Sequence, residues 1–224
     1  MRSMIRKDRD RDLVPLSILV DREVLGRRGR GIFFESADAT TADSINKMAS
    51  LGHGIVSVAM AAARAYELGL SPISTGPRRP HMPVFVSSVE GRECTETGIS
   101  AAERAITAET LGRKRCERKD LVSPGHIMPA IVQEKLDRDS ALCELAFRYA
   151  ERSAGSHAVT WCDILNAEGE TASAQECFAL AKKLELNFYV CRNLAVVEFR
   201  RLPEKLRELY FEVRGGDLSL DQFA

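Results

Sequence analysis

The chain has 224 residues, of which 45% are hydrophobic and 29% charged, a composition typical of a globular protein and not of a disordered one. Its 32 basic and 32 acidic residues balance to a formal net charge of zero. A general binder of nucleic acid or of membrane surfaces would have an excess of basic residues, so the composition argues against both classes of protein. No apolar run approaches the ~20 residues of a membrane span, and the charged start MRSMIRKDRDRD lacks the apolar core of a signal peptide. We therefore expect a cytoplasmic protein whose partners include neither nucleic acid nor a membrane.

Apolar patterns in the first half of the chain predict strands that alternate with helices and loops. Residues 1–15 form a charged arm without apolar periodicity, which we expect to be flexible. Short apolar runs predict strands at 13–20, 32–34, 55–60 and 84–89. Helices are predicted from Thr41, with Thr41 or Asp43 as the N-cap, and over 61–68. A further helix is predicted from Ser100, where Ser100 is the expected N-cap and Glu103 takes the capping-box position.

The second half of the chain continues this alternation. The segment LVSPGHIMPAIV at 121–132 contains too much proline and glycine for a long element, so we expect a loop there. Helices are predicted at 140–152 and 174–184, and strands at 158–165, 186–191 and 195–199. A last helix is expected from Pro203, followed by a mobile tail. Together these elements predict one α/β (α+β) domain in which helices flank a mixed β-sheet.

Motifs in these loops and the elements beside them occur in a fixed order. They are TETGISAAERA (95–105), SPGHIMPA (123–130), WCDILNAEGETAS (161–173), SAQECFALAKKL (173–184) and CRNLAVVEFRR (191–201). With the upstream segments ILVDREVLGRRGRGIFF, SINKMA and GHGIVSVAM, the chain resembles 3,4-dihydroxy-2-butanone 4-phosphate synthase over residues 16–201. The resemblance implies a synthase-like domain at 16–202, followed by a C-terminal helix and tail at 203–224.

The resemblance also implies a function. The family forms the four-carbon precursor of riboflavin from ribulose 5-phosphate and expels one carbon as formate. A homodimeric lyase is therefore implied, with an α/β sandwich fold and sites at the subunit interface. Acidic residues would hold a divalent metal at the substrate hydroxyls and move protons.

This chain departs from the family's pattern at most positions that bind metal or substrate. In the loop LGRRGR (25–30), Gly26 stands where the metal-ligating glutamate belongs, and Arg30 where a second acid belongs. Arg138 replaces the metal-binding histidine of a GHTEA-like stretch, and Asp139 replaces its phosphate-contacting threonine. Further replacements are Lys135 for a phosphate-binding arginine, Ser57 for a cysteine, Ser123 for an arginine and Asp163 for a glutamate.

The two arginines decide what we expect of the metal. Mg²⁺ needs oxygen ligands, and an arginine side chain supplies only N–H donors. A guanidinium beside the ion would also repel it by several kcal/mol, even at an effective dielectric constant of about 20. We therefore expect no metal and no other cofactor in this site.

The remaining residues favour a divergent, metal-independent enzyme. An anionic substrate, resembling a sugar phosphate or a carboxylate, would be bound by Arg27, Arg28, Arg30, Thr97, Lys135 and Arg138. His126 is the candidate general acid or base, and Asp163 is its orienting or second acid–base group. Cys162 lies on an apolar strand, so we expect its thiol to be inert.

Two other hypotheses remain open at this point. The first is that the chain is a catalytically inactive paralogue that serves as a ligand-binding or partner subunit. The loss of so many acidic residues favours this hypothesis. Alternatively, the chain is a working riboflavin-pathway lyase with an unusual site. A structural role also competes for single residues, since His126 could be a turn histidine and the arginines a solvated loop.

Overall fold

The computed structural model describes residues 13–21, 30–74, 76–77, 79–192, 194–205 and 207. Most of the predicted arm lies outside the described residues, and so do Arg27 and Arg28 of the basic loop. Most of the helix expected from Pro203 and the whole tail also lie outside them.

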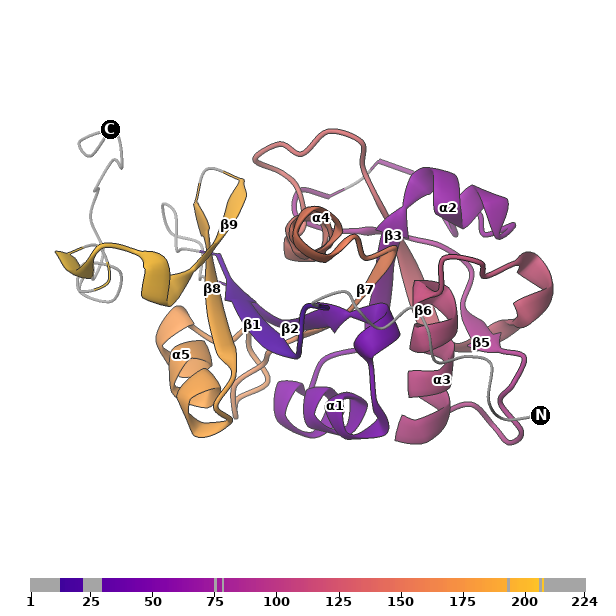
Figure 1. Cartoon of the computed structure of the whole chain (residues 1–224), viewed down its shortest axis with the longest axis horizontal. Coiled ribbons are helices and arrows are strands. Elements are labelled where there is room, and N and C mark those ends of the chain that lie inside the picture. Colours follow the sequence, from indigo (N-terminus) through magenta and orange to yellow (C-terminus); the bar gives the residue numbers. More distant parts are fainter. Residues whose placement is uncertain are drawn as a thin grey trace.

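The described residues form nine strands: β1 Ser17–Val20, β2 Gly31–Ser36, β3 Ser57–Ala61, β4 Val84–Phe85, β5 Val89–Gly91, β6 Leu121–Val132, β7 Ala158–Asp163, β8 Asn187–Arg192 and β9 Ala195–Glu198. They build one sheet in the order β4–β6–β3–β7–β2–β1–β8–β9, and β5 also pairs with β6 (Figure 1). The pairs β3–β6 and β1–β8 are parallel and the others antiparallel. The predicted mixed sheet is therefore confirmed.

Helices cover both faces of this sheet. They are α1 Ala42–Lys47, α2 Ala62–Glu67, α3 Ala101–Gly112, α4 Leu142–Ala154 and α5 Ala174–Lys183, with a π-helical turn at Met48–Gly52. Helices α1, α3 and α5 lie on one face, and α4 lies on the other (Figure 1). None of the helices in the described ranges is long and apolar enough to cross a membrane.

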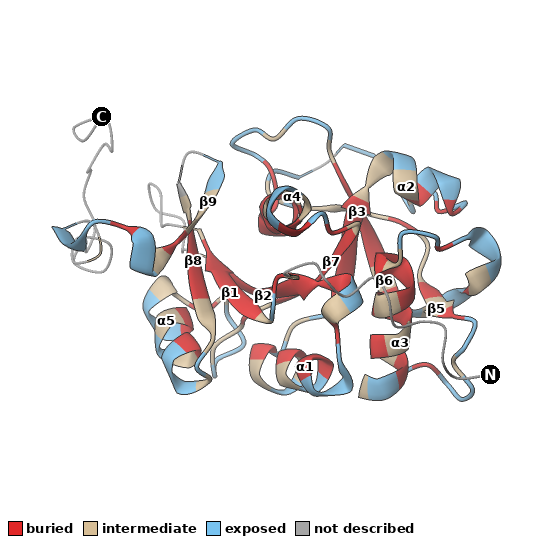
Figure 2. Ribbon diagram, in the orientation of Figure 1, coloured by how far each residue is buried: buried red, intermediate tan, exposed pale blue. Residues whose placement is uncertain are grey.

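Strand alternation produces two separate apolar clusters, one on each face. On β2, Phe33 belongs to the cluster beneath α1, α3 and α5, whereas Ile32 and Phe34 belong to the cluster beneath α4. The buried residues follow the central strands and the helix faces turned toward them (Figure 2). The sheet is therefore covered on both sides, which explains why its strands read as continuous apolar runs.

The expectation of a loop at 121–132 is wrong, because this segment is the twelve-residue strand β6. Pro129 keeps its place in the sheet through its carbonyl, which accepts a hydrogen bond from the Val86 N–H at 2.9 Å. Gly125 is needed for the strand rather than against it, because a Cβ there would overlap the backbone of Val89 in β5. The proline and glycine content of this segment therefore predicted the wrong structure, because the neighbouring strands determine which residues β6 can contain.

The other predicted helices and strands that fall within the described residues are present with modest differences in extent. Thr41 is the N-cap of α1, and its hydroxyl accepts a hydrogen bond from the Ser44 N–H at 3.1 Å. The single strand expected at 84–89 is divided into β4 and β5, which pair with different parts of β6.

A buried carboxyl group joins the sheet to α1. Glu35 of β2 is only 3% exposed and accepts a hydrogen bond from the Ser44 hydroxyl at 2.6 Å. Burial raises the pKa of Glu35 to about 7, although hydrogen bonds from Ser44 and Thr40 and the charge of Lys47 act against the rise. Protonation of Glu35 therefore favours the folded state.

We expect Glu35 to make stability depend on pH. Between pH 4.5 and about 7 the unfolded chain releases this proton while the folded chain retains it, so the free energy of unfolding falls across that window. Glu35→Gln should remove this fall and make the protein about 3 kcal/mol more stable than the parent above neutral pH. The exposed Glu67→Gln variant is the control. Urea unfolding that gives all three proteins the same dependence on pH would contradict the assignment.

Candidate functional site

Asp163 and Arg30 lie together at one end of the sheet. Asp163 is the last residue of β7 and pairs with Ile32 of β2. Arg30 immediately precedes β2, so it lies close to Asp163 at this end of the sheet. Both side chains belong to the face covered by α4, since Ile32 and Trp161 at alternate positions contribute to the cluster there. Burial raises the pKa of Asp163, and the Arg30 charge opposes this.

Arg30 also connects two segments that are distant in the sequence. Its Nη1 donates to the His81 carbonyl at 3.2 Å, and the His81 N–H donates to the Asp139 carbonyl at 2.6 Å. The His81 ring adds a longer contact, 3.4 Å from Nδ1 to the Ser140 carbonyl. The turn that contains Arg138 is therefore held near Arg30, at the start of α4.

A buried glutamate fixes the approach to α4. The Glu144 carboxylate accepts hydrogen bonds from the Ala141 N–H at 2.7 Å and the Gln133 N–H at 3.0 Å. These bonds join the two ends of segment 133–141 to the first turn of the helix. Lys135 and Arg138 are exposed along this segment.

Two buried polar atoms belong to residues near Asp163 on the face covered by α4. Ser57 of β3 and Trp161 of β7 are paired directly, and both side chains face α4. Within the described part of the chain, Ser57 Oγ and Trp161 Nε1 are buried without a hydrogen-bond partner. Such atoms are rare in folded proteins and indicate a place for a ligand group or an ordered water.

His126 forms the other half of the site with a residue that the sequence analysis did not select. Its Nδ1 lies 2.5 Å from Oε1 of Glu90 on β5. The His126 side chain is 43% exposed and the Glu90 side chain is 17% exposed. A carboxylate on one ring nitrogen fixes the tautomer and leaves Nε2 for a ligand or water.

The two halves are separated by the width of β3. His126 lies two residues before Met128, which pairs with Ser57, and Asp163 lies two residues after Trp161, which also pairs with Ser57. Since β6 runs parallel to β3 and β7 antiparallel, His126 and Asp163 stand at the same end of the sheet. Two strand spacings place their backbones roughly 10 Å apart, which a small molecule can bridge.

Thr97 reaches this region on a turn that Glu103 holds. Ser100 caps α3 as predicted, but the Glu103 carboxylate does not return to the Ser100 N–H as a capping box requires. Instead it accepts from the N–H groups of Thr95, Glu96 and Gly98 at 3.1, 2.7 and 2.8 Å. The expected capping box is therefore corrected: Glu103 fixes the loop before the helix, where Thr97 is exposed.

The structure thus brings Arg30, Asp163 and the Arg138 turn to one side of β3, and places His126 on the other. Sequence reasoning missed Glu90 and His81, because neither stands in a motif that indicates chemistry. Burial raises the pKa of Cys162 to about 12, which keeps its thiol protonated as expected.

The described donors at this end of the sheet do not fit a divalent metal ion. Among the described residues, no three histidine, cysteine, aspartate or glutamate side chains converge as a ligand set. Asp163 has Arg30 as its charged neighbour, and position 138 supplies another guanidinium. Neither arginine has an oxygen that Mg²⁺ can use.

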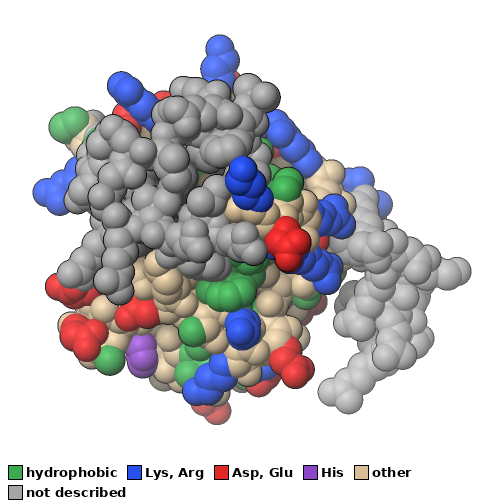
Figure 3. Space-filling view, turned by 90° about the vertical axis from the view of Figure 1, so that its left-hand side faces the viewer, with side chains coloured by type: hydrophobic (Ala, Val, Ile, Leu, Met, Phe, Trp, Pro, Cys, Tyr) green, Lys and Arg blue, Asp and Glu red, His purple; other side chains and the backbone are tan. Residues whose placement is uncertain are grey.

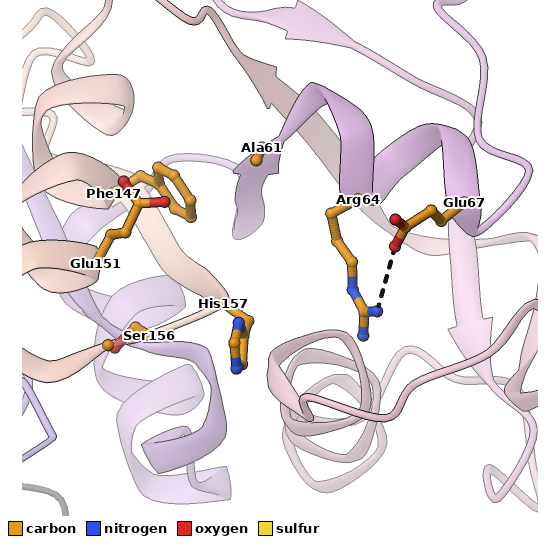
Figure 4. A pocket seen from close by; sticks show the side chains of 8 residues that line it. Ala61, Arg64, Glu67, Phe147, Glu151, Ser156 and His157 are labelled. Atoms are coloured by element: carbon orange, nitrogen blue, oxygen red, sulfur yellow. Dashed lines mark ion pairs between the residues drawn. The ribbon is translucent and has the colours of Figure 1, made fainter.

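A cavity of about 400 Å³ lies at the opposite end of the sheet, away from these residues. Arg64 and Glu67 of α2 form one wall, and Phe147 and Glu151 of α4 form another (Figure 4). The charged side chains in and beside its walls form ion pairs. Nη1 of Arg64 lies 3.8 Å from Oε2 of Glu67, and Nη1 of Arg148 lies 2.9 Å from Oε2 of Glu151. We therefore place the candidate site at His126 and Asp163 and not in this cavity.

The described surface at the β8–β9 end of the molecule does not present a field of one charge. Basic and acidic side chains are interspersed on that face (Figure 3). This mixture agrees with the balanced composition of 32 basic and 32 acidic residues.

Comparison with known proteins identifies the relatives of the chain. The chain is 32% identical to the riboflavin biosynthesis protein RibBA of Bacillus subtilis over 178 residues, covering 79% of this chain and 44% of the relative. It is also similar to the crystal structure of RibBX, a two-domain 3,4-dihydroxy-2-butanone 4-phosphate synthase from A. baumannii. That match has a TM-score of 0.66 and 27% identity over 79% of this chain and 52% of the other.

A third structure supports the fold alone. It is a 3,4-dihydroxy-2-butanone 4-phosphate synthase in complex with two magnesium ions, with a TM-score of 0.70 and 19% identity, covering 79% and 87% of the two chains. This chain spans about half the length of RibBA and RibBX. The family model for 3,4-dihydroxy-2-butanone 4-phosphate synthase matches residues 16–196. The resemblance and the fold expected from it are thus confirmed, and the chain belongs to the 3,4-dihydroxy-2-butanone 4-phosphate synthase family.

Proposed function

We propose that this chain is a divergent family enzyme that binds an anionic small molecule and moves protons on it without a metal. The observation that carries this proposal is the meeting of Arg30, Asp163 and the His126–Glu90 pair at one end of the sheet. The substrate class is a sugar phosphate or a related carboxylate, since the relatives are proteins of riboflavin biosynthesis.

The cationic side is suited to an anion. Arg30 uses one N–H on the His81 carbonyl, and its fork of five donors leaves others for phosphate or carboxylate oxygens. Arg138 lies on the turn that His81 holds beside it. In this proposal the guanidinium groups stabilise negative charge on the substrate, the task that a metal performs elsewhere. Arg27, Arg28, Lys135 and Thr97 remain predicted contributors to binding.

The proton-transfer side is suited to acid–base work. Glu90 orients the His126 ring and leaves Nε2 as the group that exchanges a proton with the substrate. Asp163 is the second such group, because burial raises its pKa toward the range in which a carboxyl group gives and takes protons. Ser57, on the strand between the two groups, and Trp161, two residues before Asp163, carry buried polar atoms without partners in the described part of the chain.

An inactive ligand-binding or partner subunit is the second candidate. The arginine at position 30 favours it, since the family's acid-dependent chemistry is lost there. The two candidates differ in turnover and not in binding. A working lyase in riboflavin synthesis is the third candidate, and it requires a metal.

We expect Arg30→Ala to weaken anion binding about tenfold or more, since a charge-assisted hydrogen bond is worth ~1.5–3 kcal/mol. Calorimetric titration with inorganic phosphate and with ribulose 5-phosphate measures this. Arg152→Ala, an exposed arginine on the last turn of α4, is the matched control and should bind like the parent. If Arg30→Ala lowers the melting temperature markedly as well as weakening binding, Arg30 has a structural role and the assignment of the anion site is wrong.

We expect the protein to exchange carbon-bound protons of ribulose 5-phosphate with D₂O in the presence of EDTA. His126→Ala should abolish this exchange, followed by proton NMR, and leave the dissociation constant within about twofold, because the ring transfers the proton. Exchange that stops with EDTA and returns with Mg²⁺ would contradict metal independence. Binding without any exchange by the parent protein would favour the inactive subunit.

We also propose a homodimer, as the resemblance implies. Exposed apolar side chains lie at the end of the sheet where His126 stands: Ile55 is 69% exposed, Ile99 53% and Val122 42%. Val122 pairs with Glu90, and Ile99 follows the turn that contacts Glu90. A second copy would cover these residues and shield the site from water.

We expect analytical ultracentrifugation at micromolar concentration to give about twice the monomer mass of 24.8 kDa. Ile99→Glu should shift the protein toward monomer, because a buried charge costs free energy at an apolar interface. Tyr66→Glu on α2, at the far end of β3, should leave the dimer intact. A parent protein that sediments only as monomer would contradict the proposal.

A further inference from the structure

Glu103 is buried at the third residue of α3, yet its carboxylate points back into the loop before the helix. Its bonds to the N–H groups of Glu96, Gly98 and Thr95 lower its pKa, with the Glu96 bond contributing most and burial acting in the opposite direction. The ionised carboxylate therefore fixes three of the four backbone positions of the 95–98 turn. A side chain that only capped α3 would not contact this turn.

The turn is in direct contact with the His126–Glu90 pair through Gly98. Gly98 has φ +76°, in the left-handed region, and a Cβ there would overlap the Glu90 carboxylate. The backbone at Gly98 therefore packs against Glu90 and limits where its carboxylate can lie. Glu90 in turn holds Nδ1 of His126.

We propose that Glu103 is a positioning residue for His126, acting through the Gly98 backbone and the Glu90 carboxylate. Glu103 does not contact His126, so its effect is on the orientation of the ring. The effect of these contacts on catalysis rests on the proposed function, but the contacts from Glu103 to His126 are structural. They can therefore be tested apart from turnover.

The test is the tautomer of His126, read from the chemical shifts of its two ring nitrogens by ¹⁵N NMR. In the parent protein we expect Nδ1 to carry the proton that it donates to Glu90. Glu103→Gln replaces one acceptor oxygen with an NH₂ group that faces N–H donors, so the turn should be released and the two tautomers should average. Ring shifts that match the parent in Glu103→Gln would overturn the proposal.

Two controls separate positioning from general loss of structure. Glu109→Gln removes the same charge from a half-exposed position on α3. Ser100→Ala removes the N-cap and its hydrogen bond to Glu103 while keeping the Glu103 carboxylate and its three bonds to the 95–98 turn. Both should leave the His126 tautomer fixed, although Ser100→Ala should lower stability. Averaged tautomers in either control would show that the ring responds to the helix as a whole, and would overturn the specific role of Glu103.

Gly98→Ala disturbs the next contact with Glu103 still in place, so it keeps the test decisive if Glu103→Gln fails to fold. We expect this variant to average the tautomers, and a fixed tautomer there would overturn the proposal. If the parent exchanges substrate protons, the rate constant in Glu103→Gln should fall about tenfold while phosphate affinity stays within about twofold. Failure of exchange in the parent contradicts the proposed function and leaves the NMR result to decide the role of Glu103.

Discussion

The site depends on buried carboxylates that bind backbone N–H groups where a helix begins. Glu103 in α3 and Glu144 in α4 both occupy the third helical position, and each accepts hydrogen bonds from the segment before its helix. The N–H groups of a first helical turn lack partners within the helix, and negative charge there is stabilised by the helix dipole. The same two carboxylates therefore stabilise helices and fix the two loops that flank the candidate site.

The mixed sheet supplies the second constraint. Because β3 lies between β6 and β7, His126 and Asp163 are two strands apart in the sheet. Helices pack against both faces of this sheet and keep the strands in place. Residue 30 contributes the charge beside Asp163 at this end of the sheet. An acid there would add an oxygen donor for a cation, whereas Arg30 places a guanidinium, which carries only N–H donors, near Asp163. Under the proposed function, the residue at this one position favours an anion over a metal ion.

Local sequence patterns predicted most elements because their signals are local. Thr41 and Ser100 accept hydrogen bonds from backbone N–H groups within their own first turn, so their N-caps can be read from the sequence. The failure at 121–132 has the opposite cause. There Pro129 is tolerated and Gly125 is required because of β4 and β5, which a composition rule applied to one segment does not consider.

The sequence by itself determined the family and the alternation of strands and helices, and it places arginines, which carry no oxygen donor, at positions 30 and 138. Each follows from the order and type of residues along the chain. Only the tertiary structure decided that Glu90 orients His126 across 36 positions, and that Arg30 holds the His81 carbonyl across 51. Such contacts depend on which strands become neighbours in the sheet, and no local period or spacing in the chain encodes that order.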